Sequence, residues 1–102
     1  MNITIEPNGA PLTDELNSQI INKVARLEHY FDHIIDAVVY LHNEPTYRQV
    51  EVKLNVPMET LFVRENGETY PAALDIAFDS MKRKIIKYKE RTLKVPVRGE
   101  AK

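Results

Sequence analysis

Basic side chains are concentrated in one segment of ten residues, KRKIIKYKER at positions 82–91. Six of the ten are Lys or Arg, and only Glu90 is acidic. Lysine and arginine displace the counterions that condense on a nucleic-acid backbone, and arginine also binds phosphate oxygens through paired hydrogen bonds. These residue types at this density indicate a surface for a polyanion. The competing interpretation is a solvated helix end, where cations complement the helix dipole.

The charge of the remaining chain favours the first interpretation. Residues 1–79 contain 13 acidic and 5 basic side chains, residues 80–102 contain 2 acidic and 9 basic ones, and the net charge is −1. A basic segment on an acidic body is typical of a polyanion-binding region. The positive charge also exceeds what capping a helix requires. We therefore predict nucleic-acid binding, with an acidic body that limits indiscriminate adhesion.

The other polar residues do not predict a catalytic or metal site. His29 and His33 have a spacing that can hold a metal, but a helix would place Asp32 away from their line. Ser18 and Ser80 lack a nucleophile elbow, and the chain has no glycine-rich phosphate loop. No pair of carboxylates has a context for acid–base work. We therefore predict a binder and not an enzyme, with no metal, no cofactor and no small-molecule substrate.

Length and composition indicate one domain. The chain has 102 residues, 43% of them hydrophobic, which is enough apolar material for one core. It has no cysteine, so disulfides and cysteine-based zinc sites are excluded and a reducing environment fits. The start, MNITIEPNG, lacks the features of a signal peptide, and no apolar run approaches membrane-spanning length. We expect a cytoplasmic protein with no membrane partner.

The basic run belongs to the second of two amphipathic helices that the sequence predicts. The first spans 13–31, with Thr13 as its amino-terminal cap and apolar residues at helical spacing. The second begins after Thr69, tolerates Pro71 in its first turn and ends near Arg91. Alternating or β-branched residues predict strands at 2–5, 34–42, 49–56 and 59–65.

The order β-α-β-β-β-α predicts an α+β fold. We expect the last three strands to pair as an antiparallel meander within a four-stranded sheet. Each helix has one apolar stripe, so both should cover the sheet face that carries Val50, Val52 and Leu54. The prediction is a two-layer sandwich over residues 1–91, followed by a flexible tail at 92–102.

Helical spacing of about 100° per residue divides the cations of the second helix into two groups. One flank carries a ridge of four residues, Arg83, Lys84, Lys87 and Arg91. Lys82 and Lys89 lie nearer the apolar stripe, where their stems can cover apolar surface. We expect Lys23 and Arg26 on the first helix to join the ridge in one continuous basic surface. Tyr88 falls in the apolar arc of this helix that faces the sheet, and among the tyrosines it is also the best candidate to stack on a base.

Two collinear motifs resemble one known family. LEHYFDHIIDAVVYL at 27–41 is similar to the LEKYFD-R-I-x-x-x-x-V-x-L stretch of the ribosome hibernation-promoting factors, also called the protein Y, ribosome-associated inhibitor or sigma-54 modulation family. YPAALDIAFDSMKRKIIKYKER at 70–91 is similar to the second helix of that family, Y-A-A-I-D-x-A-x-D-K-L-x-R-Q-L-x-K-Y-K-x-R. The start, MNITI…LTDEL, also fits. The likeness covers residues 1–91 and is to the short form, which lacks the added dimerising domain.

The resemblance implies a fold like that of double-stranded-RNA-binding domains and a defined partner. Such proteins bind the small ribosomal subunit, contact its ribosomal RNA at the A and P sites, and silence translation in stationary phase or stress. We expect the free protein to be monomeric. By position, basic residues of the family's helices match Lys23, Arg26, Arg83, Lys87 and Lys89. Geometry and resemblance together predict these RNA-binding residues: Lys23, Arg26, Lys82, Arg83, Lys84, Lys87, Tyr88, Lys89 and Arg91.

The sequence also departs from the family and leaves alternatives open. Ser80 stands where the family usually has Lys, while Lys82 and Lys84 add charge at positions that are commonly uncharged or acidic. One alternative is an adaptor that docks an acidic protein, such as a transcription regulator, through apolar anchors in a charged rim. Another is a generic binder of double-stranded RNA, although the chain lacks a clear basic loop for that mode. The effect on ribosome dimerisation stays open.

Overall fold

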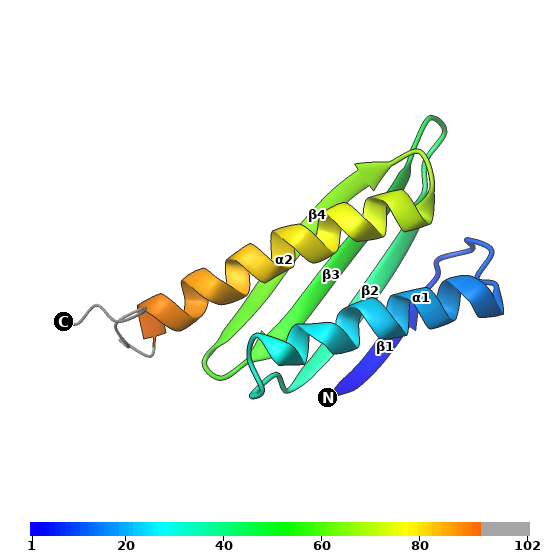
Figure 1. Ribbon diagram of the computed structural model, residues 1–102. Coiled ribbons are helices and arrows are strands. Elements are labelled where there is room, and N and C mark those ends of the chain that lie inside the picture. The colour runs from blue at the N-terminus through cyan, green and yellow to red at the C-terminus, as the bar shows by residue number, and fades with distance from the viewer. Residues whose placement is uncertain (93–102) are drawn as a thin grey trace.

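A computed structural model describes residues 1–92 of the chain (Figure 1). Its elements are β1 (Asn2–Glu6), α1 (Asp14–Ala25), the 3-10 helix η1 (Arg26–His29), β2 (Asp36–Asn43), β3 (Arg48–Val56), β4 (Glu59–Gly67) and α2 (Tyr70–Thr92). The predicted β-α-β-β-β-α order and α+β class are confirmed. The tail was predicted at 92–102. Thr92 is the last residue of α2, and the rest of the predicted tail lies outside the described residues. No helix in the described part is long and apolar enough to cross a membrane.

A single four-stranded sheet in the order β1-β2-β3-β4 forms one layer. β1 pairs parallel with β2, which requires a crossover connection, and α1 lies in that connection. β2, β3 and β4 form the predicted antiparallel meander. The register sets Val39 opposite Val52 and Val52 opposite Val63, so the apolar residues of the meander share one face.

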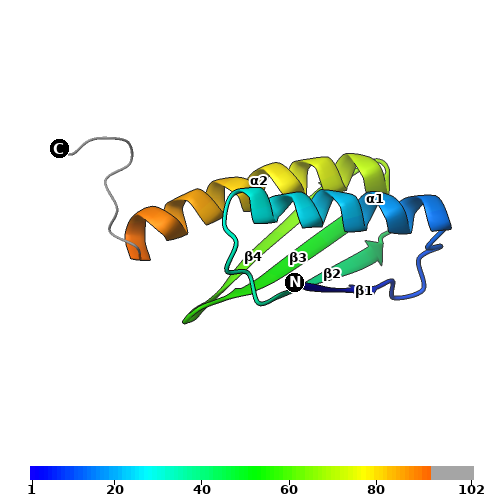
Figure 2. The same ribbon diagram turned by 60° about the horizontal axis from the view of Figure 1, so that its bottom comes forward.

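Both helices cover that apolar face (Figure 2). The largest fully buried side chains come from both layers: Ile20, Leu27, Val39, Leu41, Val50, Leu54, Met81 and Ile85. Gly67 lies directly against the first turns of α2, because a Cβ there would lie 2.7 Å from the backbone nitrogen of Ala73. The predicted two-layer sandwich is confirmed, and no helix or strand among residues 1–92 covers the other face of the sheet, which we call the open face.

The first helix is shorter than predicted. It ends at Ala25 and tightens into η1 instead of continuing to residue 31. Thr13 is the cap, as predicted, because its Oγ1 accepts a hydrogen bond from the N–H of Leu16 at 3.1 Å. After η1, the amides of Tyr30 and Phe31 both donate to the carbonyl of Leu27, which turns the chain toward β2. Apolar spacing did not reveal this turn because Phe31 remains buried in it.

The other boundaries shift by small amounts. β2 begins at Asp36 and not at 34, and β4 continues to Gly67 and not only to 65. β3 begins at Arg48, whose Nη1 donates to the carbonyls of Glu44 and Tyr47, both at 3.1 Å. Thr69 caps α2 as predicted, since its Oγ1 accepts from the N–H of Ala72 at 3.2 Å. Between these boundaries, α2 packs across β3 and β4.

Candidate nucleic-acid interface

The predicted basic ridge is present, and it faces the free edge of the sheet. Its four residues, Arg83, Lys84, Lys87 and Arg91, are all exposed on α2. A groove of about 420 Å³ runs between α2 and β4 and is lined by Phe62, Val63, Arg64, Glu65, Ser80, Arg83, Lys84 and Lys87. Four cationic side chains therefore share this groove with one carboxylate.

That carboxylate belongs to Glu65 and is held by Ser80. Glu65 opposes Val50 in the register, so it lies on the face of the sheet that the helices cover. Ser80 Oγ donates to Glu65 Oε2 at 2.8 Å, and Arg83 Nη2 donates to Ser80 Oγ at 3.4 Å. Within residues 1–92, no ion pair includes Lys84 or Lys87. Their charges are therefore available to an anionic partner.

Arg91 extends the ridge to the turn between β3 and β4. Its Nη2 lies 2.6 Å from Glu59 Oε2, and its guanidinium carbon lies 6.0 Å from the centre of the Tyr88 ring. The side chain is still 56% exposed. Arg91 thus keeps donors toward solvent, although Glu59 offsets part of its charge.

The expectation that Tyr88 stacks on a base is contradicted by its burial. Tyr88 is only 3% exposed and packs edge-to-face on Phe31, with ring centres 5.3 Å apart. Its hydroxyl donates to the carbonyl of Pro57 at 2.8 Å. The residue lies in the same apolar arc as Met81 and Ile85, so its ring belongs to the core. A base would find no free ring face there.

Lys82 and Lys89 lie on the other flank of α2, against the loop that follows η1. Lys89 Nζ donates to the carbonyl of Tyr30 at 2.6 Å, and Lys82 Nζ lies 5.6 Å from the centre of the Tyr30 ring. Both lysines are half-buried, as expected from their place near the apolar stripe. They fasten the loop, and their part in RNA binding stays a prediction.

The expectation of one continuous basic surface over both helices is wrong for the described residues. Lys23 Nζ lies 2.7 Å from Asp75 Oδ1 and 5.3 Å from the centre of the Phe78 ring. Asp75 and Arg26 line a separate groove of about 230 Å³ between the helices. This groove lies on the flank of α2 that faces α1, whereas the ridge faces β4. Sequence periodicity within each helix could not show how the two flanks would meet.

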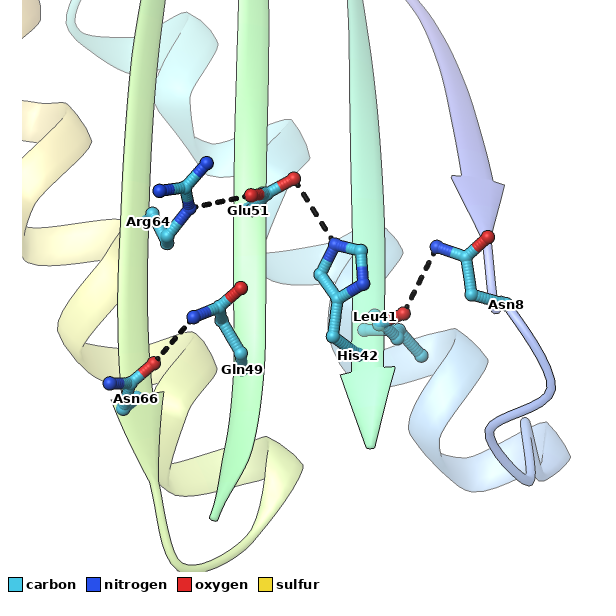
Figure 3. A network of polar contacts seen from close by, with 7 residues as sticks. All are labelled: Asn8, Leu41, His42, Gln49, Glu51, Arg64 and Asn66. Carbon is cyan, nitrogen blue, oxygen red and sulfur yellow. Dashed lines mark hydrogen bonds and ion pairs between the residues drawn. The ribbon is translucent and has the colours of Figure 1, made fainter. Parts of the chain in front are cut away.

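Sequence reasoning also missed a polar network on the open face of the sheet (Figure 3). Glu51 contacts Arg64 Nε at 2.6 Å and His42 Nε2 at 3.2 Å, bridging β2, β3 and β4. Burial of the carboxylate alone would raise the pKa of Glu51, but hydrogen bonds with Arg64 and His42 hold that pKa below its ordinary value. The strand register was the missing signal, because it alone brings these residues together.

His29 ends η1 and His33 lies in the loop that follows it, so the two histidines do not share one helix face. His33 Nε2 contacts Asp32 Oδ1 at 3.4 Å, and both side chains are largely exposed. Across residues 1–92, no group of three or more histidine, cysteine or acidic side chains is placed to hold a metal ion. The basic ridge therefore remains the chemical feature that best defines a functional surface.

Comparisons with known proteins agree on one family. The profile of the family described as sigma 54 modulation protein / S30EA ribosomal protein matches residues 3–93. The ribosome hibernation promoting factor of Azotobacter vinelandii is 29% identical over 93 residues, which cover 91% of this chain and 87% of that protein. The N-terminal domain of Thermus thermophilus protein Y has a TM-score of 0.79 at 26% identity, over 86% of this chain and 99% of that one. A ribosomal subunit interface protein from Coxiella burnetii shares the fold, with a TM-score of 0.83 at 18% identity over 87% of this chain and 98% of that one.

Proposed function

This chain belongs to the sigma 54 modulation protein / S30EA ribosomal protein family, and from that membership we propose that it is a ribosome hibernation factor. It binds the small ribosomal subunit in the channel of mRNA and tRNA, contacts ribosomal RNA at the A and P sites, and silences translation. Idle ribosomes are thereby preserved in stationary phase or stress. It acts in the cytoplasm, is monomeric when free, and works by binding and not by catalysis.

The observation that carries this proposal is the exposed basic ridge. Lys84 and Lys87 have no ion-pair partner within residues 1–92, and Arg83 contacts only the hydroxyl of Ser80 among polar side chains there. Phosphates of an RNA backbone can occupy this ridge and release their counterions, which provides affinity without reading a base sequence. A ribosomal site, where RNA is held in one shape, suits charges whose spacing is fixed by one helix.

The acidic body supports the same proposal. Most acidic side chains precede α2, so the rest of the surface repels polyanions and favours one orientation on the RNA. Once bound in the channel, the domain excludes mRNA and tRNA because it occupies their volume. The two-layer sandwich is well suited to this role, because the packed core keeps its shape against the ligands that it replaces.

Co-sedimentation with purified small ribosomal subunits tests the proposal directly. The wild type and the double variant Arg83→Glu/Lys87→Glu are compared across a salt series. We expect near-stoichiometric binding of the wild type at physiological salt and none of the double variant. A wild type that stays in the supernatant, or a double variant that binds equally well, overturns the ribosome assignment.

A further inference from the structure

β4 is an open edge of the sheet. It pairs with β3 along all nine of its residues without a bulge, and within residues 1–92 no strand pairs with its other side. Soluble proteins commonly blunt such edges with proline, a bulge, short length or charged side chains, because free backbone N–H and C=O groups recruit other strands. The strand sequence, ETLFVRENG, contains no proline but does contain charged residues. This edge can therefore accept a further strand only where the charge of that strand complements its surroundings.

The hairpin geometry determines which backbone groups point outward. A two-residue turn joins β3 to β4, so Val56 and Glu59 form the closing pair of the ladder. Backbone groups of alternate residues in an antiparallel pair point toward and away from the partner. The outward N–H and C=O groups of β4 are therefore those of Thr60, Phe62, Arg64 and Asn66. They are spaced as a second strand requires.

The groove beside this edge is strongly cationic. Lys84, Lys87 and Arg83 line it from α2, and Arg64 lines it from β4 itself, although Glu51 offsets part of the charge of Arg64. The carboxylate in the lining, that of Glu65, is bonded to the hydroxyl of Ser80. A strand added to β4 would direct every second side chain toward the basic ridge and the others toward the open face of the sheet, beside Phe62.

Charge decides between the possible occupants of the edge. A second copy of this chain, paired β4 to β4, would bring two basic ridges together, and like charges at such short range repel. An RNA strand would satisfy the cations but lacks the alternating amide and carbonyl groups that complete a ladder. We propose that the β4 edge and the basic ridge together form a docking groove for an extended acidic peptide segment of a partner protein.

This inference goes beyond ribosome binding but shares the ridge with it. Lys84 and Lys87 would be covered by the peptide or by RNA, so the two partners exclude each other. An acidic protein segment could thus keep the factor off the ribosome. The peptide alone needs the outward N–H of Phe62, which makes the two modes separable by substitution.

The test uses the isotope-labelled protein and a synthetic peptide about as long as β4, in which Glu alternates with Thr. We expect backbone amide NMR shifts and slowed hydrogen exchange at Thr60, Phe62 and Arg64, with smaller changes at Leu61 and Val63, whose amides face β3. A peptide with Lys in place of Glu should leave these amides unchanged. A short single-stranded RNA serves as the third probe.

Phe62→Pro removes an outward N–H without removing a ladder donor, and proline is tolerated at such edge positions. It should weaken peptide binding roughly fivefold or more, the effect of losing about one net hydrogen bond, and leave sedimentation with small subunits unchanged. If Phe62→Pro does not fold, Lys84→Glu/Lys87→Glu with the same peptide replaces it, and its outward amides should no longer shift. That variant tests whether the ridge charges are needed for peptide binding, while hydrogen exchange in the wild type tests whether the peptide forms backbone hydrogen bonds with β4.

Two results overturn the proposal. One is an acidic peptide that leaves the outward amides unshifted or unprotected. The other is that only the RNA probe shifts the amides that line the groove, which would assign this surface to nucleic acid alone. The two proposals can fail separately. If the ribosome proposal is wrong, the wild type does not sediment with small subunits. If the peptide proposal is wrong, the wild type still sediments but the acidic peptide does not bind, and Phe62→Pro leaves the ridge intact in both assays.

Discussion

Ser80 Oγ donates a hydrogen bond to Glu65 Oε2 at 2.8 Å, and this pair sets a carboxylate inside the groove that the basic ridge lines. The carboxylate points to the helix side because Glu65 opposes Val50 in the sheet register. It lowers the positive potential that a phosphate meets at Arg83 and Lys84. The chain therefore weakens its own proposed RNA contact at one defined position.

Glu65→Gln should bind small ribosomal subunits more tightly than the wild type. The amide still offers an oxygen to Ser80, but the opposing charge is gone, and an exposed charge pair is worth about 0.2–1 kcal/mol. We expect a gain of up to roughly fivefold at low salt that shrinks as salt rises. Glu68→Gln, which removes the same charge outside the groove, is the matched control. Equal gains from both variants would show that only net charge matters.

Lys87→Gln and Lys53→Gln form a second matched pair. Each removes one lysine charge, but Lys87 lies on the ridge and Lys53 lies on the open face of the sheet, opposite Phe62 in the register. Binding to small subunits, plotted as log affinity against log salt, should lose about one unit of slope for Lys87→Gln and stay unchanged for Lys53→Gln. A loss of slope for Lys53→Gln but not for Lys87→Gln would place the RNA on the open face of the sheet.

Tyr88→Phe should affect stability and not binding. The hydroxyl donates to the carbonyl of Pro57, and losing one such bond costs about 1 kcal/mol in the free energy of unfolding. Urea denaturation measures this loss, and Tyr40→Phe, whose hydroxyl has no bond to another described residue, is its control. A Tyr88→Phe protein that is fully folded yet binds small subunits weakly would restore a direct RNA role for this residue.

Local periodicity was sufficient to predict most of the fold. The alternation at Val50, Val52 and Leu54 identified the buried face of β3, and the helical spacing of Met81 and Ile85 identified the core stripe of α2. Both patterns arise from the geometry of a single element, so they are visible in one segment of sequence. The same reasoning separated the ridge from the apolar stripe correctly.

The periodicity of single segments could not predict contacts between residues of different helices, strands and turns. Lys23 is neutralised by Asp75, which is distant in sequence and becomes a neighbour only when α1 and α2 pack side by side. Helical spacing put Tyr88 in the apolar arc and its basic neighbours suggested RNA contact; the carbonyl of Pro57, from another part of the chain, supplies the partner that lets its hydroxyl be buried. The end of α1 was misplaced because Phe31 is buried in either geometry.

The lowered pKa of Glu51 predicts a stability that depends on pH. A carboxylate with a folded-state pKa below its unfolded value of about 4.5 stabilises the fold above that value, and this contribution is lost as pH falls through the folded-state pKa. The Arg64 and His42 contacts supply the effect, because both favour the ionised form. At pH 7, Glu51→Gln should therefore lower the free energy of unfolding by about 1 kcal/mol.

The pH profile separates this ion pair from a mere change of side chain. Urea denaturation of the wild type and Glu51→Gln, followed from pH 7 down to about pH 3, should show their difference in the free energy of unfolding shrink below the unfolded pKa. Glu6→Gln removes a carboxylate that has no ion pair within the described residues, and its difference from the wild type should be small throughout. A Glu51→Gln deficit that persists unchanged at low pH would mean that packing of the side chain, and not its charge, stabilises the three strands.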